Sequence, residues 1–229
     1  MQRWTQTQFE TLAAGATTLM ADEHGVKVLL TPDDRIIKLF RRKRWLSSTL
    51  IFPYAQRFAR ASAELAKRGI PAVRVEAVAR VRHLKRDIVV YRRLPGINLR
   101  EALANGTDAD RERLLTMLAS TLATLHERGV YFRAAHFGNF IVRDSSGDAS
   151  SLALIDVSEA SFRRAPLPTA MRARNFRPMT RYPEDLAAIR AFGVERFIER
   201  YLEHAHMPGD DAARFRVALD RVHSDFGRG

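Results

Sequence analysis

The stretch Gly129–Asp156 constrains this chain most, and it reads GVYFRAAHFGNFIVRDSSGDASSLALID. A polar loop with His136 and Asn139 runs into a short apolar segment, and a second apolar segment ends at Asp156. The turn sequence Asp-Ser-Ser-Gly separates the two segments, so the pattern predicts a β-hairpin with an Asn before it and an Asp after it. Such oxygen donors suit Mg²⁺, which takes one or two protein ligands beside a nucleotide's phosphates.

Protein kinases use this arrangement, with a loop Asn in H-R-D-x-x-x-x-N and an Asp after the next hairpin. The stretch resembles the kinase-like superfamily, and within it the bacterial lipopolysaccharide-core kinase and toluene-tolerance-type branch, whose loop often reads H-R-D-L-H-x-G-N. The residues that match this loop are Arg133, His136, Gly138 and Asn139. Phe132 stands in place of the first His, and Ala134 in place of the Asp that acts as the base.

The resemblance implies an α+β fold of the bilobal protein-kinase type. It places a small β-rich N-lobe over residues 1–94 and a mainly helical C-lobe over residues 95–229, with a hinge at Leu94–Gly96. It also implies that the chain binds ATP with Mg²⁺, and that Asn139 and Asp156 are the metal ligands.

Two N-terminal residues complete the nucleotide site that the resemblance implies. Val26–Leu30 and Arg35–Phe40 flank the turn Thr-Pro-Asp-Asp and indicate a β-hairpin. Lys38 lies in the second strand, where a kinase Lys contacts the α- and β-phosphates, and Glu64 lies on the following helix, where it would pair with that Lys. The alternatives are an outward-facing strand Lys and a Glu64 that pairs along its own helix.

The rest of the predicted N-lobe is less specific. Thr7–Met20 has weak helical periodicity, and a helix is predicted over Tyr54–Arg68. Strands are predicted over Val73–Val81 and Asp87–Arg92. Gly25 is a lone glycine, so the chain lacks the G-x-G-x-x-G phosphate loop of protein kinases.

The clearest helix is Asp108–Glu127, in which Leu and Met recur at helical spacing. We predict that it is the central helix of the C-lobe and that His126 lies at its surface. A helix is also predicted to start near Asn98, after the hinge. A helical tail is predicted over Glu184–Phe192, Val194–His204 and Asp210–Val222.

The formal net charge of +12 favours anionic partners. Two basic runs stand out, RRKR at Arg41–Arg44 and a segment from Arg163 to Arg181 that has six arginines and no carboxylate. Each is either a solvated loop or a surface that contacts an anionic sugar or glycolipid acceptor. Nucleic acid is the less favoured partner, because no known binding motif and no interleaved aromatic residues accompany the charge.

Composition sets the class and the expected compartment. A chain of 229 residues with 46% hydrophobic residues supports a packed core, and the absence of Cys excludes disulfides and thiolate metal sites. No apolar run reaches the ~18–20 residues of a membrane span, and the N-terminus lacks the apolar core of a signal peptide. We therefore expect a cytoplasmic protein, with peripheral contact at the inner membrane implied by the resemblance.

The missing carboxylate at Ala134 leaves two functions open. One is an ATP- and Mg²⁺-dependent phosphotransferase like the lipopolysaccharide-core sugar kinases, with weak or lost activity. In that case Arg133 is the catalytic-loop Arg, and His136 is the nearest candidate for a replacement base. The other is a pseudokinase that acts as a regulator or scaffold in the cell-envelope pathway.

Overall fold

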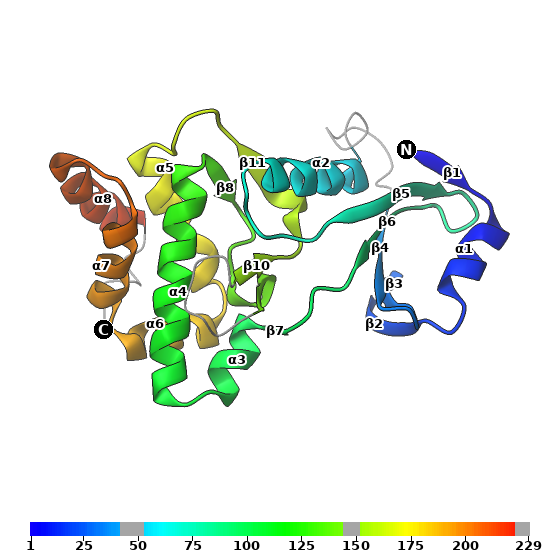
Figure 1. Cartoon of the computed structure of the whole chain (residues 1–229), viewed down its shortest axis with the longest axis horizontal. Helices are drawn as coiled ribbons and strands as arrows, with labels where there is room; N and C mark the ends of the chain where they lie inside the picture. Colours follow the sequence, from blue (N-terminus) through cyan, green and yellow to red (C-terminus); the bar gives the residue numbers. More distant parts are fainter. Residues whose placement is uncertain (42–52, 144–151, 223–229) are drawn as a thin grey trace. The chain divides into compact units, whose positions relative to one another are not determined.

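The chain folds into two compact units, each with its own core (Figure 1). The computed structural model describes residues 1–41, 53–143 and 152–222. Unit 1 comprises Met1–Lys67 and Ala72–Leu94, and unit 2 comprises Arg68–Pro71 and Pro95–Gly229. A sheet dominates unit 1 and helices dominate unit 2, so the prediction of a mixed α+β protein is confirmed.

Unit 1 is built on a six-stranded sheet in the order β1-β5-β6-β4-β3-β2. Strand β1 pairs with β5 in parallel, and the other neighbours pair antiparallel. The strands are β1 Gln2–Trp4, β2 Thr17–Asp22, β3 Gly25–Leu30, β4 Arg35–Arg41, β5 Val75–Val81 and β6 Arg86–Arg92. The predicted hairpin is β3–β4, in which Val28 lies opposite Lys38.

The N-terminal segment differs from the prediction of a helix over Thr7–Met20. Helix α1 spans only Gln6–Ala13, and the chain then turns at Gly15, whose φ of 68° is readily adopted by glycine. The following residues form the edge strand β2, which pairs with β3. The β-branched Thr17 and Thr18 and this pairing outweigh the weak helical periodicity.

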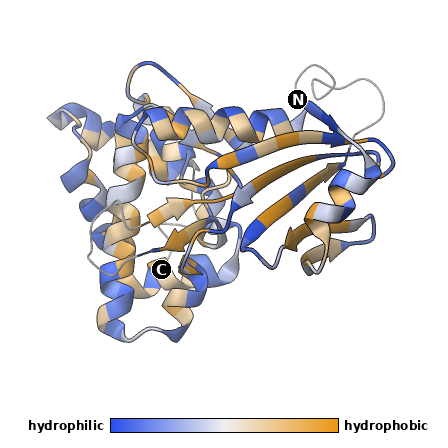
Figure 2. Ribbon diagram, turned by 45° about the vertical axis from the view of Figure 1, so that its right-hand side comes forward, coloured by the Kyte–Doolittle hydropathy of each residue, from blue (hydrophilic) through white to orange (hydrophobic). Residues whose placement is uncertain are grey.

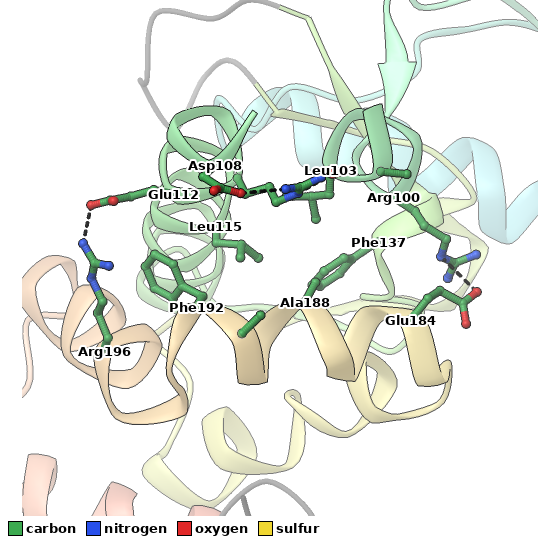
Figure 3. A pocket seen from close by; sticks show the side chains of 13 residues that line it. Arg100, Leu103, Asp108, Glu112, Leu115, Phe137, Glu184, Ala188, Phe192 and Arg196 are labelled. Atoms are coloured by element: carbon green, nitrogen blue, oxygen red, sulfur yellow. Dashed lines mark hydrogen bonds and ion pairs between the residues drawn. The ribbon is translucent and has the colours of Figure 1, made fainter. Parts of the chain in front are cut away.

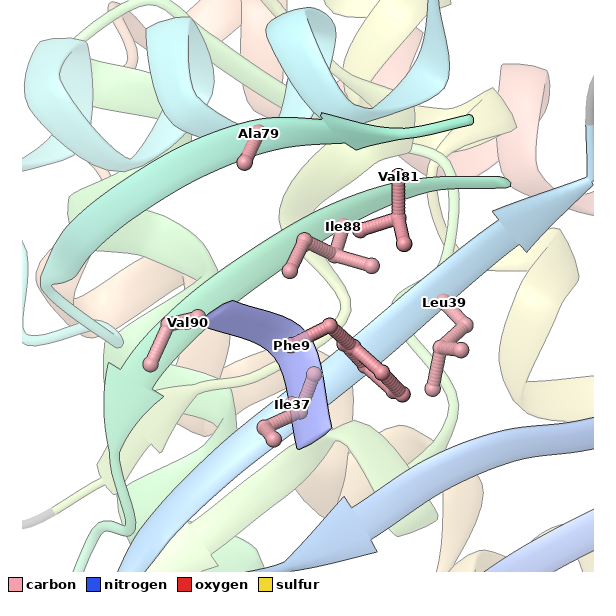
Figure 4. Packing of buried hydrophobic residues seen from close by; sticks show 7 residues of the cluster. All are labelled: Phe9, Ile37, Leu39, Ala79, Val81, Ile88 and Val90. Carbon is pink, nitrogen blue, oxygen red and sulfur yellow. The ribbon is translucent and has the colours of Figure 1, made fainter. Parts of the chain in front are cut away.

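Two helices cover the sheet of unit 1. The Phe9 side chain of α1 packs among strand residues on one face (Figure 4). These are Ile37, Leu39, Ala79, Val81, Ile88 and Val90. Helix α2, Tyr54–Lys67, packs on β5 and β6 and buries Phe58, Ala61 and Leu65. Colouring by hydropathy shows hydrophobic residues along the strands of this sheet and mixed colours on the helices (Figure 2).

Unit 2 is mainly helical, and the predicted helix over Asp108–Glu127 is confirmed as α4. The other helices are α3 Leu99–Asn105, α5 Thr169–Arg174, α6 Pro183–Phe192, α7 Val194–His204 and α8 Gly209–Val222. Two small sheets, β10-β9-β7 and β11-β8, accompany them. Their strands are β7 Ile97–Asn98, β8 Val130–Phe132, β9 Phe140–Val142, β10 Leu152–Leu154 and β11 Ala160–Phe162. The predicted hairpin strands after the polar loop are β9 and β10, which pair antiparallel.

His126 lies in the core of unit 2, so the prediction that it lies at the surface of α4 is wrong. Its Nδ1 lies 2.9 Å from the Tyr201 hydroxyl, and its Nε2 lies 3.1 Å from Asn175 Oδ1. Asn175 Oδ1 also accepts from the Phe132 N–H, so Nε2 must donate and Nδ1 must accept. Because the ring is fully buried, the charged form is disfavoured, and the pKa of His126 is lowered to about 3. The imidazole is therefore neutral.

Stability should fall in acid because of His126. Its folded-state pKa of about 3 is below the unfolded value, so the unfolded chain binds the proton first as pH drops. The stabilisation is complete above about pH 6.5 and is lost progressively down to about pH 3, by about 2 kcal/mol between pH 7 and pH 5. We expect His126→Gln to flatten the pH dependence of urea unfolding in this window. If the free energy of unfolding changed equally with pH in the wild type and in His126→Gln, the assignment of this pH dependence to His126 would be contradicted.

Candidate functional site

The candidate site is the loop between β8 and β9, and its central residue is Asn139. The Asn139 side chain is buried, and its Nδ2 donates to the Ala134 carbonyl at 2.9 Å and contacts His136 Nε2 at 3.0 Å. Because a carbonyl can only accept, this atom is the amide nitrogen, and its two hydrogens serve these two acceptors. Neither contact uses Asn139 Oδ1, which is the atom that can bind a cation.

His136 orients Asn139. Since its Nε2 accepts from Asn139, the neutral ring carries its proton on Nδ1, which is buried and has no hydrogen-bond partner in the part of the chain that the structure describes. Burial lowers the pKa of His136, against the opposing effect of Asp185. With its one lone pair engaged by Asn139, His136 is placed to hold that side chain.

Asp156 lies beside Asn139 through the backbone. The Ile155 N–H donates to the Asn139 carbonyl at 3.0 Å, so the residue before Asp156 is tied to the loop. Asp156 itself has φ 52° and ψ 46°, a left-handed conformation that is uncommon for non-glycine residues and concentrates at functional sites. The strand end is thus joined to the loop by a backbone bond one residue before Asp156.

Asp185 of α6 holds the loop through hydrogen bonds. The sequence alone did not identify it as a residue of the site. It is 0% exposed and accepts two bonds from Arg100, at 2.7 Å and 3.0 Å, and one from the Phe137 N–H at 2.9 Å. The Arg100 guanidinium lies 4.3 Å from the Tyr182 ring centroid, and Tyr182 lies 4.9 Å from the His136 ring. The hydrogen bonds to Asp185 raise the pKa of Arg100 further. The loop is therefore bonded, through the Phe137 N–H, to a buried carboxylate whose charge is paired with Arg100.

Ala134, at the position where the resemblance predicts the base, has a backbone carbonyl that accepts from Asn139. The sequence of the loop and its flanking strands, 130–143, contains no Asp or Glu. Arg133 is exposed. The predicted turn at 144–147 and residues 42–44 of the RRKR run lie outside the described residues.

Lys38 and Glu64 both belong to unit 1. Lys38 Nζ lies 5.7 Å from the Phe58 ring centroid and 5.8 Å from that of Phe40, so its side chain is on the face of the sheet that α2 covers. Glu64 lies on α2, and its carboxylate is 3.9 Å from Lys67 Nζ. Lys38 thus extends towards the helix that carries Glu64, and an ion pair between them stays a prediction.

The basic segment from Arg163 to Arg181 has short elements, including β11 before it and α5 within it. Arg172 differs from its neighbours because it is buried, where it donates to Glu127 at 2.6 Å and to the Leu167 carbonyl at 2.7 Å. The exposed arginines of the segment are Arg163, Arg164, Arg174, Arg177 and Arg181. One of the six arginines is therefore part of the core, and five are available at the surface of unit 2.

Two kinds of pattern, a metal-binding cluster and a membrane-spanning helix, are absent from residues 1–41, 53–143 and 152–222. No group of three or more His, Cys, Asp or Glu side chains is arranged to hold a metal ion there. A donor set of one carboxylate and one amide nevertheless suits Mg²⁺, whose remaining ligands are phosphates and water. None of the helices within these residues has the length and apolar character to cross a membrane.

Comparisons with known proteins identify the fold and the family of the chain. A solved structure described as WaaP in complex with acyl carrier protein matches with a TM-score of 0.57 and 17% identity, over 100% of both chains. This likeness confirms the kinase-like α+β fold. No curated protein gives a significant sequence match. The sequence model of the lipopolysaccharide kinase (Kdo/WaaP) family matches residues 22–201, which is most of the chain. The chain therefore belongs to the lipopolysaccharide kinase (Kdo/WaaP) family.

Proposed function

We propose that this protein is an ATP- and Mg²⁺-dependent phosphotransferase that acts on a sugar hydroxyl of a lipopolysaccharide-core glycolipid. The observation that carries the proposal is the orientation of Asn139, whose amide hydrogens are both engaged and whose Oδ1 is left for a cation beside Asp156. Family membership supports the choice of nucleotide and acceptor.

Asn139 and Asp156 are the proposed metal ligands. Asp156 supplies a charged carboxylate and Asn139 a neutral carbonyl oxygen, a combination that binds Mg²⁺ when phosphates complete its shell. When bound, the ion neutralises charge on the transferring phosphate and orients it. Lys38 is the proposed contact to the α- and β-phosphates, and Glu64 is proposed to orient Lys38.

Arg133 and His136 have different proposed roles. Arg133 is exposed at the loop, where a fixed positive charge attracts an anionic acceptor. His136 is proposed as a positioning residue, because its Nε2 lone pair is engaged by Asn139 and its Nδ1 carries the proton. The chain's own contribution to catalysis is then mainly positioning and charge neutralisation, which dominate phosphoryl transfer.

The acceptor and the membrane are proposed to meet the basic surface of unit 2. The five exposed arginines between Arg163 and Arg181 have no carboxylate within their segment. Lipopolysaccharide-core glycolipids are anionic, and guanidinium groups bind phosphate and carboxylate in bidentate geometry. We therefore propose a cytoplasmic enzyme that works at the surface of the inner membrane.

Ala134 favours a second candidate, a pseudokinase that regulates or scaffolds a cell-envelope pathway. A general base contributes about 10²–10⁴-fold to a rate, and an alanine cannot accept a proton. The lone Gly25 in place of a glycine-rich phosphate loop points the same way.

Transfer of radiolabelled γ-phosphate from ATP to purified lipopolysaccharide core distinguishes the two candidates. We expect slow, Mg²⁺-dependent labelling of the glycolipid that is absent in Asp156→Asn, a variant of equal size without the charge. A Glu159→Gln variant is the matched control, because this acid follows Asp156 in the chain and has no proposed role. Labelling at the same rate in Asp156→Asn would exclude the proposed metal ligand, and no labelling in any variant would favour the pseudokinase.

A further inference from the structure

Four aromatic rings meet on the face of the unit 1 sheet that α2 covers. Phe40 comes from β4 and Tyr91 from β6. Tyr54 and Phe58 come from α2, where a spacing of four residues puts them on one side of the helix. Phe58 stacks on Tyr91 with 5.5 Å between the ring centroids, and Phe40 stacks on Tyr54 at 6.5 Å. Phe40 and Phe58 are 6.0 Å apart, so the two stacked pairs form one cluster.

Lys38 lies on the same face as these rings. Side chains alternate across a strand, and the face of β4 that α1 covers carries Ile37 and Leu39 (Figure 4). Lys38 and Phe40 therefore share the other face. The Lys38 Nζ is 5.7 Å from the Phe58 ring centroid and 5.8 Å from that of Phe40, within the range of about 6 Å for cation–π contacts.

Burial strengthens the two contacts of Lys38. The Phe58 side chain is fully buried, and Lys38 is partly buried. A cation–π attraction between an ammonium and the negative face of a ring grows when water is excluded. Because a ring carries no net charge, it holds the ammonium without neutralising it, as a carboxylate would. The full positive charge of Lys38 then remains available to the phosphates of a nucleotide.

We propose that Phe58 and Phe40 are positioning residues, which hold the Lys38 ammonium by cation–π contacts for its bond to the α- and β-phosphates. This inference rests on the proposed function, because it concerns the same lysine. It adds two uncharged rings that orient Lys38 together with Glu64.

Fluorination of one ring tests the contact, because it keeps the ring and its packing but withdraws electron density from the ring face. Phe58 is replaced in the full chain by 4-fluoro-, 3,5-difluoro- and 3,4,5-trifluorophenylalanine. We expect the calorimetric affinity for ATP with Mg²⁺ to fall stepwise, to about fivefold weaker with three fluorines. In lysine-labelled protein, the ¹³Cε signal of Lys38, one of five lysines, should shift in the same steps without ATP.

Phe9 is the matched control, because its ring packs on the opposite face of the same sheet. Trifluorination of Phe9 should change neither the ATP affinity nor the Lys38 signal. In Lys38→Met, fluorination of Phe58 should no longer change the ATP affinity, because no cation remains over the ring.

Three results would each overturn the proposal. The first is an ATP affinity or a Lys38 signal that does not follow the number of fluorines on Phe58. The second is an equal fall in affinity in the Lys38→Met background, and the third is an equal effect of fluorination at Phe9. If the wild type does not bind ATP, the proposed function fails, and the Lys38 signal alone supports or overturns the ring contacts.

Discussion

Replacing Asp185 with Ala is expected to lower the free energy of unfolding by about 3–5 kcal/mol. The substitution removes a fully buried carboxylate that accepts from Arg100 twice and from the Phe137 N–H. It leaves the Arg100 guanidinium without its bidentate partner, with the half-exposed Glu184 beside it at the edge of a pocket (Figure 3), and it leaves a buried backbone donor without an acceptor. Both losses cost free energy. Urea unfolding monitored by circular dichroism measures the change.

Glu184→Ala is the matched control for Asp185→Ala. Glu184 precedes Asp185 on α6 and lies 3.4 Å from the same Arg100, but about half of its side chain is exposed. Exposed pairs contribute little, so this variant should change stability by less than about 1 kcal/mol. A loss in Asp185→Ala no larger than that in Glu184→Ala would show that the buried pair does not fix the loop.

Introducing a carboxylate at Ala134 is the second change with a large expected effect. If only the base is missing, Ala134→Asp should raise phosphoryl transfer or ATP hydrolysis by up to the ~10²–10⁴-fold typical of a general base. The backbone carbonyl at this position holds Asn139, and a side-chain change leaves that contact available. Release of radiolabelled phosphate from ATP measures the rate.

Ala134→Asn controls for size and polarity, since its amide cannot act as a base. A rise in Ala134→Asn equal to that in Ala134→Asp would mean that the carboxylate is not what the site lacks. A protein that neither binds nor hydrolyses ATP in the wild type or in Ala134→Asp would have lost its nucleotide site.

Local sequence signals predicted the elements that form the site. The hairpin after the loop follows from two short apolar runs around a turn, and α4 follows from its leucine spacing. The sequence predicted from the same hairpin that Asn139 and Asp156 act together, and the structure shows a backbone bond from Ile155, the residue before Asp156, to the Asn139 carbonyl. Patterns of this kind depend on neighbours in the sequence.

The sequence did not predict the contacts between residues that lie far apart in the chain. Asp185 is separated from Arg100 by 85 residues, and in the sequence it is one of two acids at the start of a helix, where acids are common. His126 appeared to be a surface helix-end residue because its partners, Asn175 and Tyr201, come much later in the chain. Burial of a polar side chain becomes predictable only once its partners are known.

The most direct measurement is calorimetric binding of ATP to the wild type with and without Mg²⁺, repeated with Asp156→Asn and Asn139→Ala. We expect Mg²⁺ to strengthen binding to the wild type, Asp156→Asn to lose that gain, and Asn139→Ala to lose less of it, because a neutral carbonyl offsets less of the ion's charge. Glu159→Gln should retain the full gain. ATP binding of equal strength with and without Mg²⁺ in all four proteins would contradict the assignment of Asn139 and Asp156 as the metal ligands.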